Sequence, residues 1–427
     1  MNAKPQHVIS GTATIGLATF ETLRRRGERV RLVNRSGTAP VPDDVEILGG
    51  DASDPSFATS ASRSRRAPNM DAPNTTTSAP MTAVAVDEGP ETATGRENTM
   101  KAIVLDRYGP PDVLELREID KPTPKDNEVL VKVQATTVNR TDCGFRAGTP
   151  FFTRFFTGLS RPKVTVLGSE FAGEVEAVGS GVTSFEVGDR VFGYSGLRHG
   201  SRFGAHAEYL AMPEDGLVAT MPANVSFEEA AASTEGPHYA LWFIRKAKVR
   251  SGQDVLVNGA TGAVGSAAVQ LLKSMGAQVT AVCDTRNVEL VRGLGADRVI
   301  DYTAEDFTKD EQTYDVVLDA VGMSSFGRTK RLLKPGGIYV SGDWGPKAQN
   351  PVLALVTPLF GGKKVIFPLA KDDQEMARYL KGLMESGAFR PVIDRRYRLD
   401  EIVEAYRYVE TGQKIGNVVI SVEPSTS

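Results

Sequence analysis

The spacing of apolar and polar positions changes along the chain and divides it into regions. Residues 7 to 57 read as strand, helix, strand and strand, from the runs HVISG, LATFETLRRRG, RVRLVN and VEILGGD. Residues 58 to 99 are rich in Ser, Thr, Pro and Ala and hold few large apolar side chains. Such a segment buries too little surface to offset its chain entropy. We therefore expect 1–57 to be a partial Rossmann-like fragment and 58–99 to be a disordered linker.

A compact region begins at Met100 with a β-like pattern that extends to residue 222. Its apolar runs are short and are broken by Gly, Pro and Asp, as in VLELREI, EVLVKVQATTV, GEVEAVGSGV, DRVFGY and AEYLAM. This spacing is typical of a small, partly open β-barrel.

Strands and helices alternate between residues 223 and 366. The runs DVLVNG, QVTAVC, RVIDY, DVVLDAVG and GIYVSG are strand-like, and a helical pattern spans residues 263 to 275. This alternation predicts βαβ units and a doubly wound parallel sheet, so the fold class is α/β. Residues 367–427 read as helix, strand, helix and strand. We expect them to return to the barrel domain, which then comprises 100–222 and 367–427.

The composition is that of an ordinary soluble globular protein. The 427 residues carry a formal net charge of −3, which gives no basic surface for nucleic acid or an anionic membrane. The sequence has no run of about 18 apolar residues, so we expect no transmembrane helix. The first residues lack a basic-then-apolar signal pattern, which favours the cytoplasm.

Cysteine and histidine are scarce. Cys143 and Cys283 are the two cysteines, far apart in sequence, which indicates a reducing compartment without a disulfide framework. A four-cysteine zinc site is therefore impossible. Four histidines leave little material for a catalytic zinc site: His7, His199, His206 and His238.

A glycine-rich loop joins an apolar run to an amphipathic one between Val255 and Val282. Gly259 permits a tight strand-to-helix turn, Gly262 lets a diphosphate approach the backbone, and Gly265 lets the helix pack on the strand. The helix N-terminus offers free N–H groups and a partial positive charge to phosphates. The alternative is a turn that only packs a helix. The cofactor-binding candidates of this loop are Gly259, Thr261, Gly262, Ala263, Val264 and Gly265.

The residues after the second strand bear on the choice between NAD and NADP. An acid there binds a free ribose 2′-hydroxyl, whereas a cation binds a 2′-phosphate. Asp284 favours NAD, and Thr285 and Arg286 favour NADP. A shift of one residue exchanges which side chain points inward, so the spacing leaves both cofactors open.

From residue 100 to 422 the chain resembles the medium-chain dehydrogenase/reductase superfamily, and within it the zinc-independent quinone oxidoreductase (zeta-crystallin-like) branch. About three quarters of the chain takes part, in the order of the family. The matching runs are MKAIVLDRYGPPDVLELRE, VNRTDCGFRAG, LGSEFAGEVEAVGSGV, VGDRVFGY, NGATGAVG, LGADRVIDY, DVVLDAVG and LLKPGGIYV.

The resemblance implies a reaction without metal. Zinc-dependent members carry a Cys and a Gly-His-Glu run as ligands, but here the second run is Gly168-Ser169-Glu170. The first run has Asn139 and Asp142, as zinc-independent members do. Cys143 has no histidine partner in either motif, and we expect it to be a buried structural cysteine.

The resemblance also implies roles for individual residues. Asn139 corresponds to an asparagine beside the nicotinamide and the substrate carbonyl, where an amide can donate to an oxygen that gains charge. The alternative is that Asn139 only caps a turn. Tyr302 corresponds to a tyrosine that helps hold the 2′-phosphate and, with Arg286, favours NADP. Asn417 replaces a usual Lys or Arg and weakens that preference. Val321 and Gly322, in DVVLDAVG, complete the predicted cofactor contacts.

The substrate side is less determined. The aromatic loop from Pro150 to Pro162 has two interpretations, an apolar pocket for a ring or enone, or a patch that packs on a partner subunit. His206 fits packing or hydrogen bonding better than acid catalysis. Tyr239, beside His238, is a candidate proton donor, although a core tyrosine explains it equally. The catalytic candidates are thus Asn139, Tyr239 and Asp142.

The N-terminal run HVISGTATIG has the pattern Gly11-x-Ala13-x-x-Gly16, and it resembles the start of an atypical short-chain dehydrogenase or epimerase. Ala13 puts a methyl group where phosphate would approach, and the fragment has three strands where such a domain needs about six. We interpret it as vestigial rather than as a second nucleotide site. An interaction role for residues 1–99 stays open.

These observations predict an NADPH-dependent, zinc-independent reductase of quinones or α,β-unsaturated carbonyl compounds, with NAD as the alternative cofactor. We expect a small-molecule substrate, no nucleic-acid or membrane partner, and a homodimer, which is common in the family. The alternatives are an NAD(P)-dependent alcohol dehydrogenase and a non-catalytic nucleotide-binding sensor.

Overall fold

The computed structural model describes residues 6–10, 29–34, 47–49, 98–196, 203–368 and 373–422. The chain forms two units, Met1–Gly89 and Pro90–Ser427. Within the described residues, no helix combines the length and apolar character that crossing a membrane requires.

The first unit contains three parallel strands in the order β1 (Gln6–Ser10), β2 (Arg29–Asn34) and β3 (Ile47–Gly49). These are the three strands that the sequence predicts. The helix predicted between the first two, and Gly11, Ala13 and Gly16, lie outside the described residues. The vestigial role of this fragment stays a prediction, as does the linker.

The second unit begins with a barrel-like β region. A long strand, β6, bonds to β7, β9 and β18, and its valines at 129, 131 and 133 point into the core. A hairpin of β4 and β5 accompanies a sheet of order β10-β8-β7-β6-β18-β17, with β9 on β6. The strands are β4 (Thr99–Leu105), β5 (Leu114–Asp120), β6 (Glu128–Val138), β7 (Glu170–Val178), β8 (Arg190–Tyr194), β9 (Tyr209–Pro213), β10 (Leu217–Thr220), β17 (Ile393–Arg398) and β18 (Asn417–Ser421).

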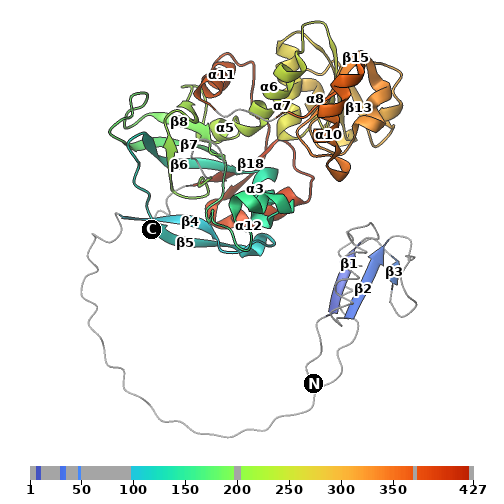
Figure 1. Ribbon diagram of the computed structural model, residues 1–427. Helices are drawn as coiled ribbons and strands as arrows, with labels where there is room; N and C mark the ends of the chain where they lie inside the picture. Colours follow the sequence, from blue (N-terminus) through green and yellow to red (C-terminus); the bar gives the residue numbers. More distant parts are fainter. Residues whose placement is uncertain are drawn as a thin grey trace, which may run out of the picture. The chain divides into compact units, whose positions relative to one another are not determined.

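Helices interrupt this β region where the sequence analysis expected strands only. The helix α3 (Arg140–Ala147) follows β6 directly, because Asn139 and Asp142 form a capping box and Gly148 ends the helix at φ +63°. A single turn, α4 (Arg154–Thr157), lies in the aromatic loop. Figure 1 shows α3 beside α12 (Ile402–Glu410), next to β18.

A six-stranded parallel sheet has the order β13-β12-β11-β14-β15-β16. This is the strand order of dinucleotide-binding folds, in which ligands bind where the order reverses, between β11 and β14. The strands are β11 (Asp254–Asn258), β12 (Gln278–Cys283), β13 (Arg298–Asp301), β14 (Tyr314–Asp319), β15 (Leu333–Ser341) and β16 (Lys364–Ile366). The helices are α5 (Phe227–Ala231), α6 (Glu235–Ala247), α7 (Ala263–Ser274), α8 (Val288–Gly293), α9 (Phe326–Thr329) and α10 (Gln349–Val356).

The C-terminal segment contributes a strand to the barrel sheet. Strand β18 pairs antiparallel with β6, with Val418 opposite Val138, and α11 (Gln374–Glu385) packs on β10. One apolar cluster runs through both parts, from Phe192 and Leu217 of the barrel to Leu241 and Val257 of the parallel sheet side. The barrel and the parallel sheet are therefore packed on each other around a shared core.

Candidate functional site

The glycine loop after β11 has the geometry that its sequence predicts. Gly259 has φ +80°, and a Cβ there would lie 2.7 Å from the Cβ of Val321. A Cβ on Gly265 would lie 2.0 Å from the carbonyl oxygen of Gly259, so helix and strand approach too closely for any side chain. Gly262 differs, because a Cβ there would meet only the Gly259 oxygen, at 3.8 Å. It would point into open space.

Gly262 is also the N-cap of α7, and no side chain caps this helix. The N–H groups of its first turn therefore face the space beside Gly262. A loop without side chains and a helix N-terminus together form a cradle suited to a diphosphate. The chain closes the cradle from the other side, since Gly416 N donates to Thr261 O at 2.6 Å.

A cavity of about 350 Å³ lies over this loop. It brings together residues predicted from three separate parts of the sequence: Asn139, Tyr239, Gly259, Thr261, Gly262, Ala263, Val264, Val321 and Gly322. Gly265 is buried behind the loop.

The residues predicted to read the ribose lie outside this cavity, at the carboxyl ends of β12 and β13. Tyr302 N donates to Cys283 O at 3.0 Å, which puts the two strand ends side by side. Asp284 accepts from Asn287 Nδ2 at 2.5 Å and lies 3.9 Å from Arg286 Nη2. The Arg286 side chain is 86% exposed.

Thr285 is held by its own neighbours at this edge. Its Oγ1 donates to Asp301 Oδ2 at 2.6 Å and lies 2.8 Å from Thr303 Oγ1. Hydrogen bonds from the Thr285 and Thr303 hydroxyls to Asp301 lower the pKa of Asp301. An exposed arginine and a carboxylate tied to an asparagine thus stand together, and the geometry keeps both cofactors open.

Asn139 is placed at the cavity, and it also caps α3. Its Oδ1 accepts from Asp142 N at 2.9 Å, and its Nδ2 donates to Ser169 Oγ at 2.8 Å. A second, longer contact from Nδ2 reaches Glu170 Oε2 at 3.4 Å. The amide donors of Asn139 are therefore engaged by the protein itself, so the capping alternative describes this conformation.

Asp142 is fully buried in the capping box and is absent from the cavity lining. Its Oδ2 accepts from Asn139 N at 3.2 Å, and its Oδ1 has no hydrogen-bond partner among the described residues. Burial, together with the charge of Glu235, raises the pKa of Asp142 well above its usual range. Asp142 therefore supports the start of α3 beside the cavity and does not line the cavity itself.

Tyr239 and Glu235 lie one turn apart on α6 and both line the cavity. Tyr239 is half-buried and packs near His238 and Phe243, with ring centroids 5.4 and 6.2 Å away. The face of α6 that turns to the glycine loop thus carries a phenol and a carboxyl.

A buried polar cluster, which the sequence analysis missed, supports that face. Glu170 is fully buried, and its Oε1 accepts from Thr234 Oγ1 and from Glu235 N, both at 2.7 Å. Its Oε2 accepts from Thr137. Glu235 accepts from Thr141 Oγ1 at 2.6 Å. The sequence signal for this cluster was the single glutamate, Glu235, in the run AAASTEGPHYAL. The small residues around it are suited to burial, so a glutamate among them indicates a buried acid.

Lys414 enters the same cavity from the loop before β18. Its Nζ donates to Gly416 O at 2.5 Å. Burial lowers its pKa, and the charges of Glu235 and Glu170 act in the opposite sense. Burial and the charge of Glu170 raise the pKa of Glu235 to about 8.

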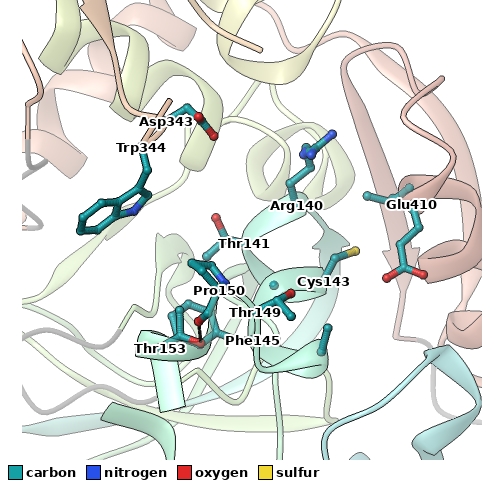
Figure 2. A pocket seen from close by; sticks show the side chains of 13 residues that line it. Arg140, Thr141, Cys143, Phe145, Thr149, Pro150, Thr153, Asp343, Trp344 and Glu410 are labelled. Atoms are coloured by element: carbon teal, nitrogen blue, oxygen red, sulfur yellow. Dashed lines mark hydrogen bonds between the residues drawn. The ribbon is translucent and has the colours of Figure 1, made fainter. Parts of the chain in front are cut away.

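A second pocket of about 500 Å³ adjoins the first (Figure 2). Arg140, Thr141, Asp343 and Val409 line both. In Figure 2, Trp344 and Glu410 lie on opposite sides of this pocket, and Cys143 lies on the side of Glu410. An opening with an aromatic wall therefore leads to the cavity over the glycine loop.

The aromatic loop contributes to this pocket through Pro150 and Thr153. The rings of Phe151 and Phe155 instead point outward, with 61% and 67% of each residue exposed. The interpretation of the loop as a pocket wall thus holds for part of it, and a packing role for its exposed rings stays a prediction.

Two further candidates are structural. His206 is fully buried, its Nε2 lies 2.8 Å from Thr137 O, and burial lowers its pKa to about 4, so the ring is neutral at pH 7. Cys143 is buried, and burial raises its pKa to about 12, as expected of a structural thiol. In the described ranges, no group of three or more His, Cys, Asp or Glu side chains is arranged to hold a metal ion. The prediction of a reaction without metal stays a prediction.

Comparison with known families assigns both halves of the second unit. Residues 125–223 match the alcohol dehydrogenase GroES-like domain, and residues 294–420 match a family described as zinc-binding dehydrogenase.

Three relatives align with the chain from the barrel onward. It is 36% identical over 333 residues to 2-methylene-furan-3-one reductase of Solanum lycopersicum, covering 76% of this chain and 80% of the relative. It is 33% identical to the chloroplastic NADPH-dependent alkenal/one oxidoreductase of Arabidopsis thaliana, covering 75% and 79%. It is 31% identical to the quinone oxidoreductase of Homo sapiens, covering 75% and 96%.

Solved structures of similar proteins also superpose on this chain. The quinone oxidoreductase from Coxiella burnetii superposes with a TM-score of 0.68 at 31% identity, covering 76% of this chain and all of that one. A mycobacterial protein complexed with NADPH superposes with a TM-score of 0.62 at 27% identity, covering 76% and 100%.

Two glycine substitutions separate cofactor binding from folding at this loop. Gly262→Ala adds a methyl group that faces the cavity, so we expect the free energy of unfolding to change by less than about 0.5 kcal/mol while dinucleotide affinity falls. Gly265→Ala forces helix from strand and should lower the free energy of unfolding by about 1–3 kcal/mol. Urea unfolding and fluorescence titration with NADPH measure the two effects. Equal destabilisation by both substitutions would contradict the geometry described for Gly262.

Proposed function

The chain belongs to the medium-chain dehydrogenase/reductase superfamily and is an NAD(P)-dependent oxidoreductase, and we propose that it uses NADPH to reduce quinones or α,β-unsaturated carbonyl compounds. The observation that carries this proposal is the junction of two pockets. The cavity over the glycine loop suits the reduced nicotinamide, and the pocket lined by Trp344 and Phe145 suits a flat, apolar acceptor. Three relatives with such activities in their names support the substrate class.

The residues present fit a dinucleotide. Gly262 leaves free the space that a side chain would fill, and the first turn of α7 offers its N–H groups to the phosphates. When bound, the cofactor supplies hydride, and the protein supplies position and hydrogen bonds. We assign cofactor contacts to Gly259, Thr261, Gly262, Ala263, Val264, Gly265, Asp284, Thr285, Arg286, Tyr302, Val321 and Gly322.

The choice of NADPH rests on Arg286 and Tyr302, both exposed at the carboxyl edge of the sheet. Asp284 favours NADH, but its carboxylate is bonded by Asn287 and is close to Arg286. A 2′-phosphate would give the exposed guanidinium a second partner besides Asp284. The NADPH named for the Arabidopsis relative and held by the mycobacterial neighbour supports this choice.

Reduction without metal is consistent with the residues at the cavity. Asn139 and Ser169 bond to each other, and neither is a usual ligand of zinc. Stabilisation of the oxygen that gains charge then falls to hydrogen-bond donors of the chain. Asn139 and Tyr239 line the cavity, and we propose the Tyr239 phenol as one such donor.

A homodimer is proposed through the open edge of the parallel sheet. Strand β16 ends the sheet order, and α10 packs beside it. Val352, Leu355, Leu359 and Phe360, on α10 and the turn after it, are 59%, 77%, 80% and 80% exposed. Within the described residues β16 pairs only with β15, and an apolar patch beside this terminal strand fits a second copy of this chain. We retain the cytoplasm as the proposed location.

The function is tested by following oxidation of NADPH and NADH with a panel of quinones and enones, with zinc measured in the same preparation. We expect turnover with NADPH and no stoichiometric zinc. The chain lacking residues 1–89 should behave alike, because the second unit holds both pockets. Binding of NADPH without turnover would favour the sensor alternative, and stoichiometric zinc would favour an alcohol dehydrogenase.

Arg286→Ala tests the cofactor preference. Loss of an exposed charged contact to the 2′-phosphate should cost about 1–2 kcal/mol, which is about a five- to thirtyfold rise in the KM for NADPH. The KM for NADH should stay within about twofold. Arg292→Ala, on the exposed side of α8, is the matched control. Equal effects on both cofactors would contradict the assignment.

The dimer is tested by Leu355→Asp and Leu359→Asp with light scattering after size exclusion. Each places a charge in the apolar patch and should yield a monomer whose thermal unfolding is otherwise similar. Leu116→Asp, at a 44% exposed position on β5, is the control and should stay dimeric. A wild-type chain that is monomeric at micromolar concentration would refute the interface.

A further inference from the structure

The reduction leaves a negative charge on the acceptor oxygen, and the residues first considered for that oxygen do not fit it equally well. The side-chain amide of Asn139 already donates its hydrogen bonds to Ser169 and Glu170. Asp142, in the first turn of α3, is fully buried and does not line the cavity. The cavity contains another acidic group, the carboxyl of Glu235, which is 7% exposed.

Glu235 lies where both pockets meet. It belongs to the lining of the cavity over the glycine loop, and it accepts from Thr141, a residue that lines both pockets. Tyr239 is on the same face of α6, one turn further on. The carboxyl of Glu235 therefore lies beside the space that the two pockets share.

Two other acids and two cations surround Glu235. Glu170 from β7 binds the backbone N–H of Glu235, and Asp142 from α3 is close enough for its charge to interact with Glu235. Lys414, from the loop before β18, is the cation whose charge acts on Glu235, and Arg140 lies at the start of α3 on the cavity wall. Cys143 is a buried neutral thiol.

Two buried carboxylates beside each other do not both ionise readily. Glu170 accepts hydrogen bonds from Thr137, Thr234 and the Glu235 N–H, so both of its oxygens are engaged as acceptors. The proton is therefore held on Glu235, whose pKa of about 8 leaves the carboxyl mostly neutral at pH 7. An acid with a pKa near the working pH is suited to proton transfer.

We propose that the neutral carboxyl of Glu235 donates a hydrogen bond to the acceptor oxygen and then gives it a proton, with Lys414 as a positioning residue. This inference rests on the proposed reductase function. Hydride, one hydrogen with two electrons, enters the β-carbon of an enone, and the π electrons move to the carbonyl oxygen. That oxygen forms a bond to the Glu235 proton as the carboxyl O–H bond breaks. The enol becomes the saturated ketone, and solvent returns a proton to Glu235.

A quinone follows the same course. Hydride converts it to the hydroquinone monoanion, and Glu235 supplies the proton that completes the hydroquinone. After either transfer, the new Glu235 carboxylate faces the ammonium group of Lys414. A protonated carboxyl in an apolar site is a known way to provide a strong neutral donor to an oxyanion.

The test compares Glu235→Gln, Glu235→Asp and Lys414→Met with the wild type across pH 6 to 10. Wild-type kcat should fall as pH rises through about 8, because the acid form is lost. Glu235→Gln should bind NADPH within about twofold of the wild type, lose about 100-fold in kcat at pH 7, and lack this alkaline fall. Glu235→Asp should keep a displaced fall. Glu289→Gln, on the exposed face of α8, is the charge-matched control and should behave as the wild type.

Lys414→Met tests the proton site without altering Glu235. Removal of a cation that lowers the pKa of Glu235 should move the alkaline fall to higher pH. A fall that stays in place in Lys414→Met, or an unchanged kcat and profile in Glu235→Gln, would overturn the proposal and leave Tyr239 or solvent as the donor.

An infrared titration separates this proposal from the proposed function. A C=O stretching band of a protonated carboxyl that is lost between pH 7 and about pH 9 should be present in the wild type and missing in Glu235→Gln. Absence of this difference band overturns the inference even in an active enzyme. A wild type that shows the band but consumes no NADPH with any acceptor would instead refute the reductase function.

Discussion

The site depends on the carboxylate of Glu170. This side chain is fully buried on β7, and its two oxygens accept from Thr137 on β6 and from Thr234 and the Glu235 N–H at the start of α6. Leaving a buried carboxylate unpaired would cost several kcal/mol, so these donors must stay in place. One group therefore fixes the helix that carries Glu235 and Tyr239 against the barrel.

A few close backbone contacts also hold the loops on the other side of the cavity. Gly265 lets α7 touch β11, and the N–H of Gly416 binds the carbonyl of Thr261, so the chain end before β18 stands beside the glycine loop. Lys414 precedes that contact by two residues, and its position follows from it. The cofactor cradle and the polar cluster are thus held by backbone contacts between segments about 150 residues apart in sequence.

Much of this arrangement could be read from the sequence, because periodicity and glycine spacing report local geometry. The strand from Gln278 to Cys283 and the helix from Ala263 are where the pattern puts them. Helix α3 was missed, since the residues after Asn139 are polar and its signal is a capping box within a β-like region. Glu235 and Lys414 were missed for another reason. Their importance comes from burial together, and no local pattern records which distant side chains share one cavity.

The charge at the reaction centre follows from two substitutions in the motifs that hold metal in zinc-dependent members of the superfamily. Asn139 and Ser169 stand in those runs, and they satisfy each other with a hydrogen bond of 2.8 Å. The acidic residue of the second run, Glu170, is retained, and Glu235 lies next to it. Without two further ligands to share a cation, these carboxyls must balance their charge in another way. In the proposed mechanism a proton on Glu235 and the ammonium of Lys414 do so, and that proton is the one we propose to pass to the reduced oxygen.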